Sequence, residues 1–154
     1  MQARATWKGG FETHLEDGRG HRVTVDLPVD EGGRDVGTSA LELMVLSLAG
    51  CISTIFALIA EKRKLTYDGM TISLTAVRPR GAPTITKVEG RIAVQSAAAQ
   101  GEVETVVRLT VRTCPVGALL ERAHVPIEVE VVVTPPSLAA KQGSDPGHVS
   151  PEPG

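Results

Sequence analysis

The feature that most constrains this chain is the run from residue 43 to residue 60, which holds no charged side chain. Ser39 and Glu42 precede the run in an S-x-x-E pattern, and three cations, Lys62 to Lys64, follow it. The S-x-x-E pattern is typical of a capping box at a helix start, and cations suit the negative end of the helix dipole. The stretch therefore predicts one long helix, apolar on almost every side, which a soluble protein must bury on almost every side.

A run of this length is also at the short end of what a membrane span requires. Polar and small residues within it, together with helix ends suited to water, favour a buried helix of a soluble protein instead; these residues are Ser47, Gly50, Ser53 and Thr54. The run lies too deep in the chain for a signal peptide. We therefore expect no membrane partner. With only two cysteines in the chain, we expect a reducing, cytoplasmic location.

The composition argues against several classes of function. Aromatic residues make up 3% of the chain and the formal net charge is −2, so neither base stacking nor a basic footprint indicates nucleic-acid binding. The four histidines show no metal-ligand spacing with either cysteine. The sequence also lacks a phosphate-binding loop and a dinucleotide fingerprint. We expect no nucleic-acid partner, no metal and no cofactor.

Turn signals and alternating apolar residues predict the other elements. Strands are expected at residues 2–7, 11–15, 21–27, 70–77, 84–94 and 125–134, and helices at residues 97–113 and 114–124. Residues 97–113 fit both a helical stripe and strand alternation. We prefer a helix there, because five positions fit the helical period and three fit the alternation.

This order of elements predicts an α+β domain over residues 1–134, in which antiparallel sheets wrap a long buried central helix. Residues 135–154 are expected to be a tail, disordered from Ser137 to Gly154, because they are rich in Pro, Gly, Ser and charge. One small sheet can hardly cover a helix that is apolar all round. A second copy of the chain is therefore expected to cover the other side, which predicts a homodimer.

The two cysteines are the candidate reactive groups. Cys114 precedes Pro115 at the start of a short helix, where amides and the helix dipole favour a thiolate. Cys51 lies in the middle of the apolar helix, where burial raises a thiol pKa. Ser47 and Thr54 are helical neighbours of Cys51 and candidate pocket hydroxyls, although most simply they bond back to helix carbonyls. On this reasoning Cys114 is the better thiolate, and Cys51 is more simply a small apolar residue.

The pattern S-A-L-E-L-M-V-L-S-L-A-G-C, with a later T-C-P-V, resembles the OsmC/Ohr superfamily. The start M-Q-A-R-A-T-W, with Gly20-His21 and then Asp26, is closest to its YhfA-like branch. The resemblance covers residues 1–134. It implies an OsmC-like fold and an intertwined homodimer with the two long helices at its centre.

The resemblance also implies a chemistry. In the peroxidase members of the superfamily, the helix cysteine attacks an organic hydroperoxide and becomes a sulfenic acid. The later cysteine resolves it to a disulfide, and a dithiol reductant restores the pair. Carried over, Cys51 is peroxidatic and Cys114 is resolving, which is the opposite order from the one that the helix dipole favours.

The sequence departs from the peroxidase pattern at two positions. The glutamate of that pattern falls on Leu41, one residue before Glu42. The activating arginine falls on Phe11, with Arg19 and Arg22 as nearby substitutes. The alternatives to a peroxidase are therefore a small-ligand-binding or stress-associated dimer that has lost the chemistry, and a purely structural dimer.

Overall fold

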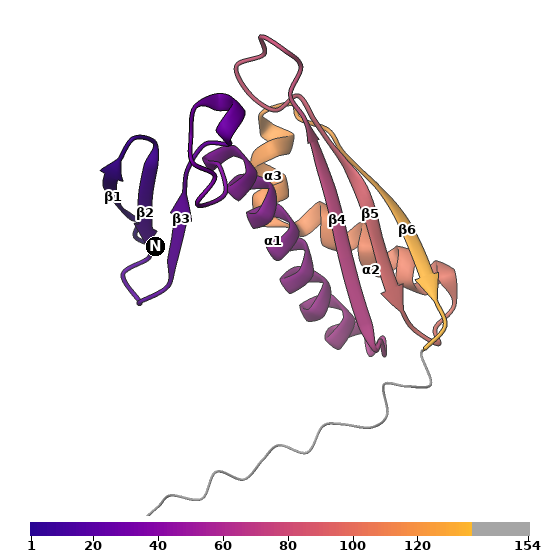
Figure 1. Cartoon of the computed structure of the whole chain (residues 1–154). Coiled ribbons are helices and arrows are strands. Elements are labelled where there is room, and N and C mark those ends of the chain that lie inside the picture. The colour runs from indigo at the N-terminus through magenta and orange to yellow at the C-terminus, as the bar shows by residue number, and fades with distance from the viewer. Residues whose placement is uncertain (137–154) are drawn as a thin grey trace, which may run out of the picture.

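The computed structural model describes residues 1–136, which form two three-stranded sheets and three α-helices (Figure 1). The α+β class is confirmed. The disordered tail predicted for residues 137–154 lies outside the described residues. In chain order the elements are β1 (Arg4–Gly9), β2 (Glu12–Glu16), β3 (Arg22–Val25), a 3₁₀ turn η1 (Val29–Glu31), α1 (Ala40–Arg63), β4 (Gly69–Val77), β5 (Lys87–Gln95), α2 (Gln100–Thr113), α3 (Pro115–Arg122) and β6 (Ile127–Thr134).

The ends of α1 are the ones that the sequence predicts. The Ser39 hydroxyl accepts a hydrogen bond from the Glu42 N–H at 3.3 Å, and the Glu42 carboxylate accepts one from the Ser39 N–H at 2.7 Å. At the other end Lys64 is left-handed, and its N–H bonds to the carbonyls of Ala60 and Glu61. Each end therefore satisfies several of its backbone groups with bonds inside its own turn.

One side of α1 is covered within the chain and the other is open. The side chains of Leu48, Ile52 and Phe56 follow the helical period and are almost fully buried, where α1 contacts α2, α3 and β4. On the open side, Leu46 and Leu58 are 58% and 48% exposed. One chain therefore does not bury α1 on almost every side, although the sequence predicts that burial. The reason is that the strands of the β1–β3 sheet contact mainly one another and leave this side of α1 uncovered.

Length and composition alone would also let α1 cross a membrane, since its most apolar window has a mean hydropathy of 2.4. Its buried side, however, belongs to the main apolar core, together with residues of the second sheet such as Val88 and Ile92. The helix therefore packs as the central helix of a folded domain, with one side left for another surface.

The second sheet has the order β4-β5-β6 and mixed direction. β4 and β5 pair antiparallel, but β5 and β6 pair parallel, which corrects the expectation of antiparallel sheets throughout. The reason is the connection, because α2 and α3 lie between β5 and β6 and carry the chain back before β6 starts. The three helices lie together beside this sheet (Figure 1).

The segment with the ambiguous pattern is helical, as predicted. It forms α2, and its buried residues Val103, Val106, Val107 and Thr110 are those of the helical stripe. Their β-branched character favours strands by propensity, but the apolar period decides. Cys114 follows α2 as its C-cap and precedes α3 as its N-cap.

The first sheet is the predicted antiparallel meander of β1, β2 and β3. After it, the buried Asp26 accepts hydrogen bonds from the backbone N–H groups of Arg34 and Val36, at 3.0 and 3.4 Å. Burial alone would raise the pKa of Asp26, but the N–H groups of Leu27, Arg34 and Val36 outweigh it and the pKa is lowered. This carboxylate therefore shapes the loop that leads into α1.

Candidate thiol site

The fold brings the two cysteines together. Cys51 lies in the middle of α1 and is partly exposed, whereas Cys114 is fully buried at the junction of α2 and α3. Both thiols are free, and they lie close enough for the Cys51 thiol to affect the pKa of Cys114. The contact of α1 with α3 thus joins residues that are far apart in the sequence.

The environment of Cys114 favours its protonated form. Burial, and then the interaction with the neighbouring Cys51 thiol, raises the pKa of the Cys114 thiol to about 11. The Gly117 N–H donates to the Cys114 Sγ at 3.3 Å, which lowers the pKa, but by less. The prediction that the helix dipole makes Cys114 the better thiolate is therefore wrong, because desolvation outweighs the helix N-terminus.

The two candidate pocket hydroxyls lie on the outside of α1. Thr54 is exposed, and its hydroxyl donates to the carbonyl of Gly50 at 3.0 Å, which is the simple helical bond considered from the sequence. Ser47 is also exposed. Both neighbour Cys51 by helical spacing, and both belong to the open side of the helix.

Glu42 is held at the start of α1. Hydrogen bonds from the backbone and side chain of Ser39 lower the pKa of its carboxyl group. Cys51 is nine residues further along, which places it about 13 Å away along the helix axis. Within one chain, Glu42 therefore acts as a helix cap and does not reach the thiols.

Arg19 lies in the turn between β2 and β3, and Arg22 is the first residue of β3. The Arg19 guanidinium pairs with Asp17 at 2.9 Å, and that of Arg22 lies 3.9 Å from Glu16. Both guanidinium groups are largely exposed, and the sheet that carries them stands apart from the helical side of β4–β6 (Figure 1). One chain thus brings neither arginine to Cys51.

The sequence reasoning missed Gly117. A Cβ atom at this position would lie 3.4 Å from the Cys114 Cβ and 3.6 Å from its Sγ, so the first turn of α3 lies directly against the thiol. The available signal is spacing, because a residue three positions after an N-cap offers its N–H to the cap side chain. Reading Cys114 as the N-cap identifies Gly117 as its partner.

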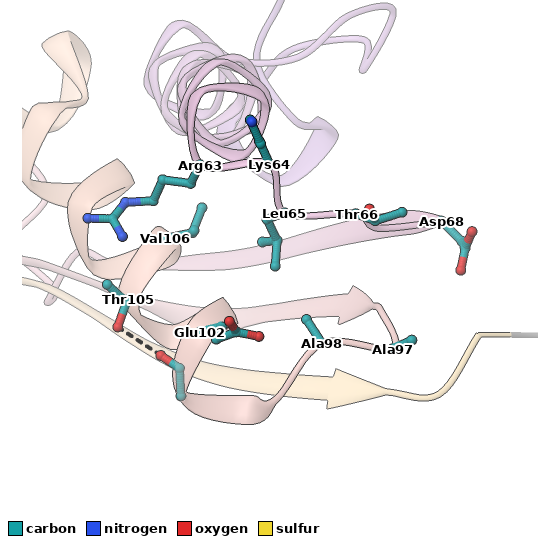
Figure 2. A pocket seen from close by; sticks show the side chains of 11 residues that line it. Arg63, Lys64, Leu65, Thr66, Asp68, Ala97, Ala98, Glu102, Thr105 and Val106 are labelled. Atoms are coloured by element: carbon teal, nitrogen blue, oxygen red, sulfur yellow. Dashed lines mark hydrogen bonds between the residues drawn. The ribbon is translucent and has the colours of Figure 1, made fainter.

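Three of the cavities in the described part of the chain lie at the two ends of α1. One of about 540 Å³ lies where the end of α1 meets the start of α2 (Figure 2). Its charged lining is mixed, with Arg63 and Lys64 against Asp68 and Glu102. Two others, of about 710 and 330 Å³, share Glu42 at the start of α1. None of these three is lined by a cysteine, by Ser47 or by Thr54.

Comparison with known proteins adds a family and a fold. The family described as OsmC-like protein matches residues 31–130. No curated protein matches the chain. An OsmC-like protein from Mycoplasma pneumoniae is 17% identical, with a TM-score of 0.76, over 86% of this chain and 95% of the other.

Two further solved structures are named organic hydroperoxide resistance proteins. The one from Legionella pneumophila is 21% identical, with a TM-score of 0.65, over 86% of this chain and 96% of the other. The one from Elizabethkingia anophelis is 18% identical, with a TM-score of 0.70, over 86% and 94%. At these identities the likeness shows the fold alone.

Proposed function

This chain belongs to the OsmC-like family, and from that premise we propose that it is a thiol-dependent peroxidase that reduces small organic hydroperoxides. The observation that carries the proposal is the contact between the Cys51 and Cys114 thiols. Two neighbouring thiols on packed helices need little movement to form a disulfide. The names of the two hydroperoxide resistance proteins with this fold support the choice of substrate.

The difference between the thiols assigns their roles in this proposal. Cys51 is the partly exposed one, so its thiolate attacks the terminal peroxide oxygen, releases an alcohol and becomes a sulfenic acid. Cys114 is enclosed and predominantly protonated at neutral pH, which suits a group that acts second. Its sulfur then attacks Cys51 Sγ, water leaves, and the disulfide forms. A dithiol reductant restores the pair, without a metal or cofactor.

The remaining parts of the proposal concern assembly and location. We propose a homodimer, because the open side of α1 and the first sheet leave apolar side chains uncovered in one chain. A second copy could also bring an arginine or Glu42 to the thiols. The free cysteines suit a reducing cytoplasm.

One observation favours the alternative, a dimer with this fold that binds a small ligand and has lost the chemistry. No charged group of the candidate set lies beside Cys51 within the described chain, because Glu42 caps α1 and both arginines pair within the first sheet. A thiol without a cation nearby has less help in ionising.

The experiment that separates the two functions is stopped-flow measurement of thiol loss in the reduced protein. Cumene hydroperoxide and hydrogen peroxide are each mixed with the wild type, Cys51→Ser and Cys114→Ser. A peroxidase loses its thiols much faster with the organic peroxide. Cys51→Ser abolishes this reaction, and Cys114→Ser leaves a sulfenic acid. Oxidation no faster than that of free cysteine rules out the peroxidase and leaves the ligand-binding dimer.

A further inference from the structure

Gly117 contacts the Cys114 thiol in two ways, through its N–H and through the side chain that it lacks. The N–H donates to Cys114 Sγ at 3.3 Å, so the sulfur caps α3 in the way that a serine hydroxyl caps a helix. A Cβ at position 117 would lie 3.4 Å from the Cys114 Cβ and 3.6 Å from its Sγ. Both residues are buried, so a side chain larger than a methyl group would press on the thiol.

This contact fixes the direction of the Cys114 side chain. A cysteine side chain without such a bond can occupy three staggered positions about its Cα–Cβ bond. The bond to the Gly117 N–H selects the position in which the sulfur lies over the first turn of α3. In this position, where α1 packs on α3, the Cys51 thiol is near enough to affect the ionisation of Cys114.

We propose that Gly117 is a positioning residue for disulfide closure, because its N–H and its missing side chain hold Cys114 Sγ in place to attack Cys51. This inference deepens the proposed function and rests on it, since closure is the second step of that reaction. In closure Cys114 loses its proton and its sulfur bonds to Cys51 Sγ. The bond from Cys51 to its leaving group breaks, and the leaving group takes the electron pair. On a sulfenic acid the leaving group is hydroxide, which takes up the proton and departs as water.

The same N–H acts on the charge that develops in closure. Cys114 attacks as a thiolate, whereas its burial favours the protonated thiol. A hydrogen bond to a charged acceptor is stronger than one to a neutral acceptor, so the Gly117 N–H stabilises the thiolate as it forms. Both effects act on Cys114 and leave the first reaction of Cys51 unchanged. A change at Gly117 should therefore slow closure without slowing that first reaction.

The test replaces the peroxide with a disulfide reagent, so that it does not depend on the peroxidase. The reduced protein is mixed with one equivalent of dithiodipyridine. The Cys51 thiolate displaces one thiopyridone and becomes a mixed disulfide. Cys114 then attacks Cys51 Sγ and displaces the second thiopyridone, and the absorbance follows both releases. Cys114→Ser should release the first thiopyridone and not the second, which assigns the second release to closure.

Gly117→Ala and Gly117→Val form a graded series. We expect the second release to slow by about twofold to fivefold with alanine and by more than about tenfold with valine, because displacement of the sulfur costs alignment. The first release should stay within about twofold of the wild type. Gly101→Val is the matched control, since Gly101 also lies in the first turn of a helix but has no atom within 4 Å of its Cβ position. Unchanged closure in Gly117→Val, or equal slowing in Gly101→Val, overturns the proposal.

A second measurement covers the case in which Gly117→Val does not fold. Cys114→Ala removes the sulfur that accepts from the Gly117 N–H, and amide hydrogen exchange by NMR reports the loss. The Gly117 amide should exchange at least about tenfold faster than in the wild type. The Ala118 amide bonds to the Cys114 carbonyl at 2.9 Å and should change much less. Unchanged exchange at Gly117, or equal acceleration at both amides, overturns the proposal.

The failure of this inference differs from the failure of the proposed function. A wild type that ignores cumene hydroperoxide, with slow closure in Gly117→Val, refutes the peroxidase and supports the role of Gly117. A wild type that reduces the peroxide, with closure in Gly117→Val as fast as its own, refutes the role of Gly117 and leaves the peroxidase standing.

Discussion

A thiol at a helix start is subject to two opposing effects, and Cys114 shows their relative size. The N-terminal amides of α3 favour the thiolate, and one of them, the Gly117 N–H, points at the sulfur. Burial favours the protonated thiol, as does the interaction with the neighbouring Cys51 thiol. The pKa of about 11 shows that burial wins. An anion at a helix N-terminus is stabilised most when solvent also reaches it, and Cys114 has no exposed surface within the described residues.

The raised pKa of Cys114 predicts a dependence of stability on pH. The folded thiol has a pKa of about 11 against a reference of 9.0 for an unfolded chain. Between these values the unfolded state loses the proton first and is favoured. The contribution is therefore complete below about pH 9 and is lost as the pH rises through 11. Urea unfolding at pH 8 and pH 10.5 should show a larger loss of stability in the wild type than in Cys114→Ala. Equal losses would contradict the assignment.

Glu42 has two possible roles, a local one as a helix cap and a distant one beside Cys51, and the sequence predicts only the first. Its position three residues after Ser39 predicts a capping box, and the structure confirms it, because both hydrogen bonds lie within one helical turn. A role beside Cys51 depends on chain geometry over a longer range. No pattern in the sequence sets that geometry, so this role stays a prediction about the assembled protein.

At the scale of elements, the caps of α1 explain how an uncharged helix keeps definite ends. Replacing Ser39 with Ala removes the acceptor for the Glu42 N–H. The expected cost is about 1 kcal/mol of unfolding free energy. Ser53→Ala is the matched control, since Ser53 is exposed within the same helix, and it should stay within about 0.5 kcal/mol of the wild type. Urea unfolding measures both, and equal effects would mean that the cap contributes nothing specific.

The elements that the sequence predicts well are those whose signals are local. The start of α1 follows from its capping box, and α2 follows from the spacing of Val103, Val106 and Val107. The direction of β6 against β5 is different, because strand alternation is the same in parallel and antiparallel sheets. Likewise, the meeting of Cys51 with Cys114 depends on how α1 packs on α3. Only the family resemblance linked these two residues in advance.

At the scale of the whole molecule, one chain leaves two apolar surfaces uncovered. The first is the open side of α1, with Leu46 and Leu58. The second is the β1–β3 meander with its turn, where Trp7 and Phe11 are more than half exposed. Patches of this kind mark surfaces that bind a partner. A two-fold assembly would cover both, because each copy offers the same surfaces to the other.

The assembly can be tested with one charge. Leu58→Glu places a carboxylate on the open side of α1. In a two-fold dimer both copies carry this change, so two carboxylates are buried in the interface. Light scattering with size-exclusion chromatography should show a dimer for the wild type at micromolar concentration and a monomer for Leu58→Glu. Leu119→Glu is the control, because Leu119 is equally apolar and 66% exposed but lies on α3, and it should remain dimeric. A monomeric wild type, or a dimeric Leu58→Glu, would show that this side of α1 is not the interface. The thiols would then have to work with the groups of one chain alone.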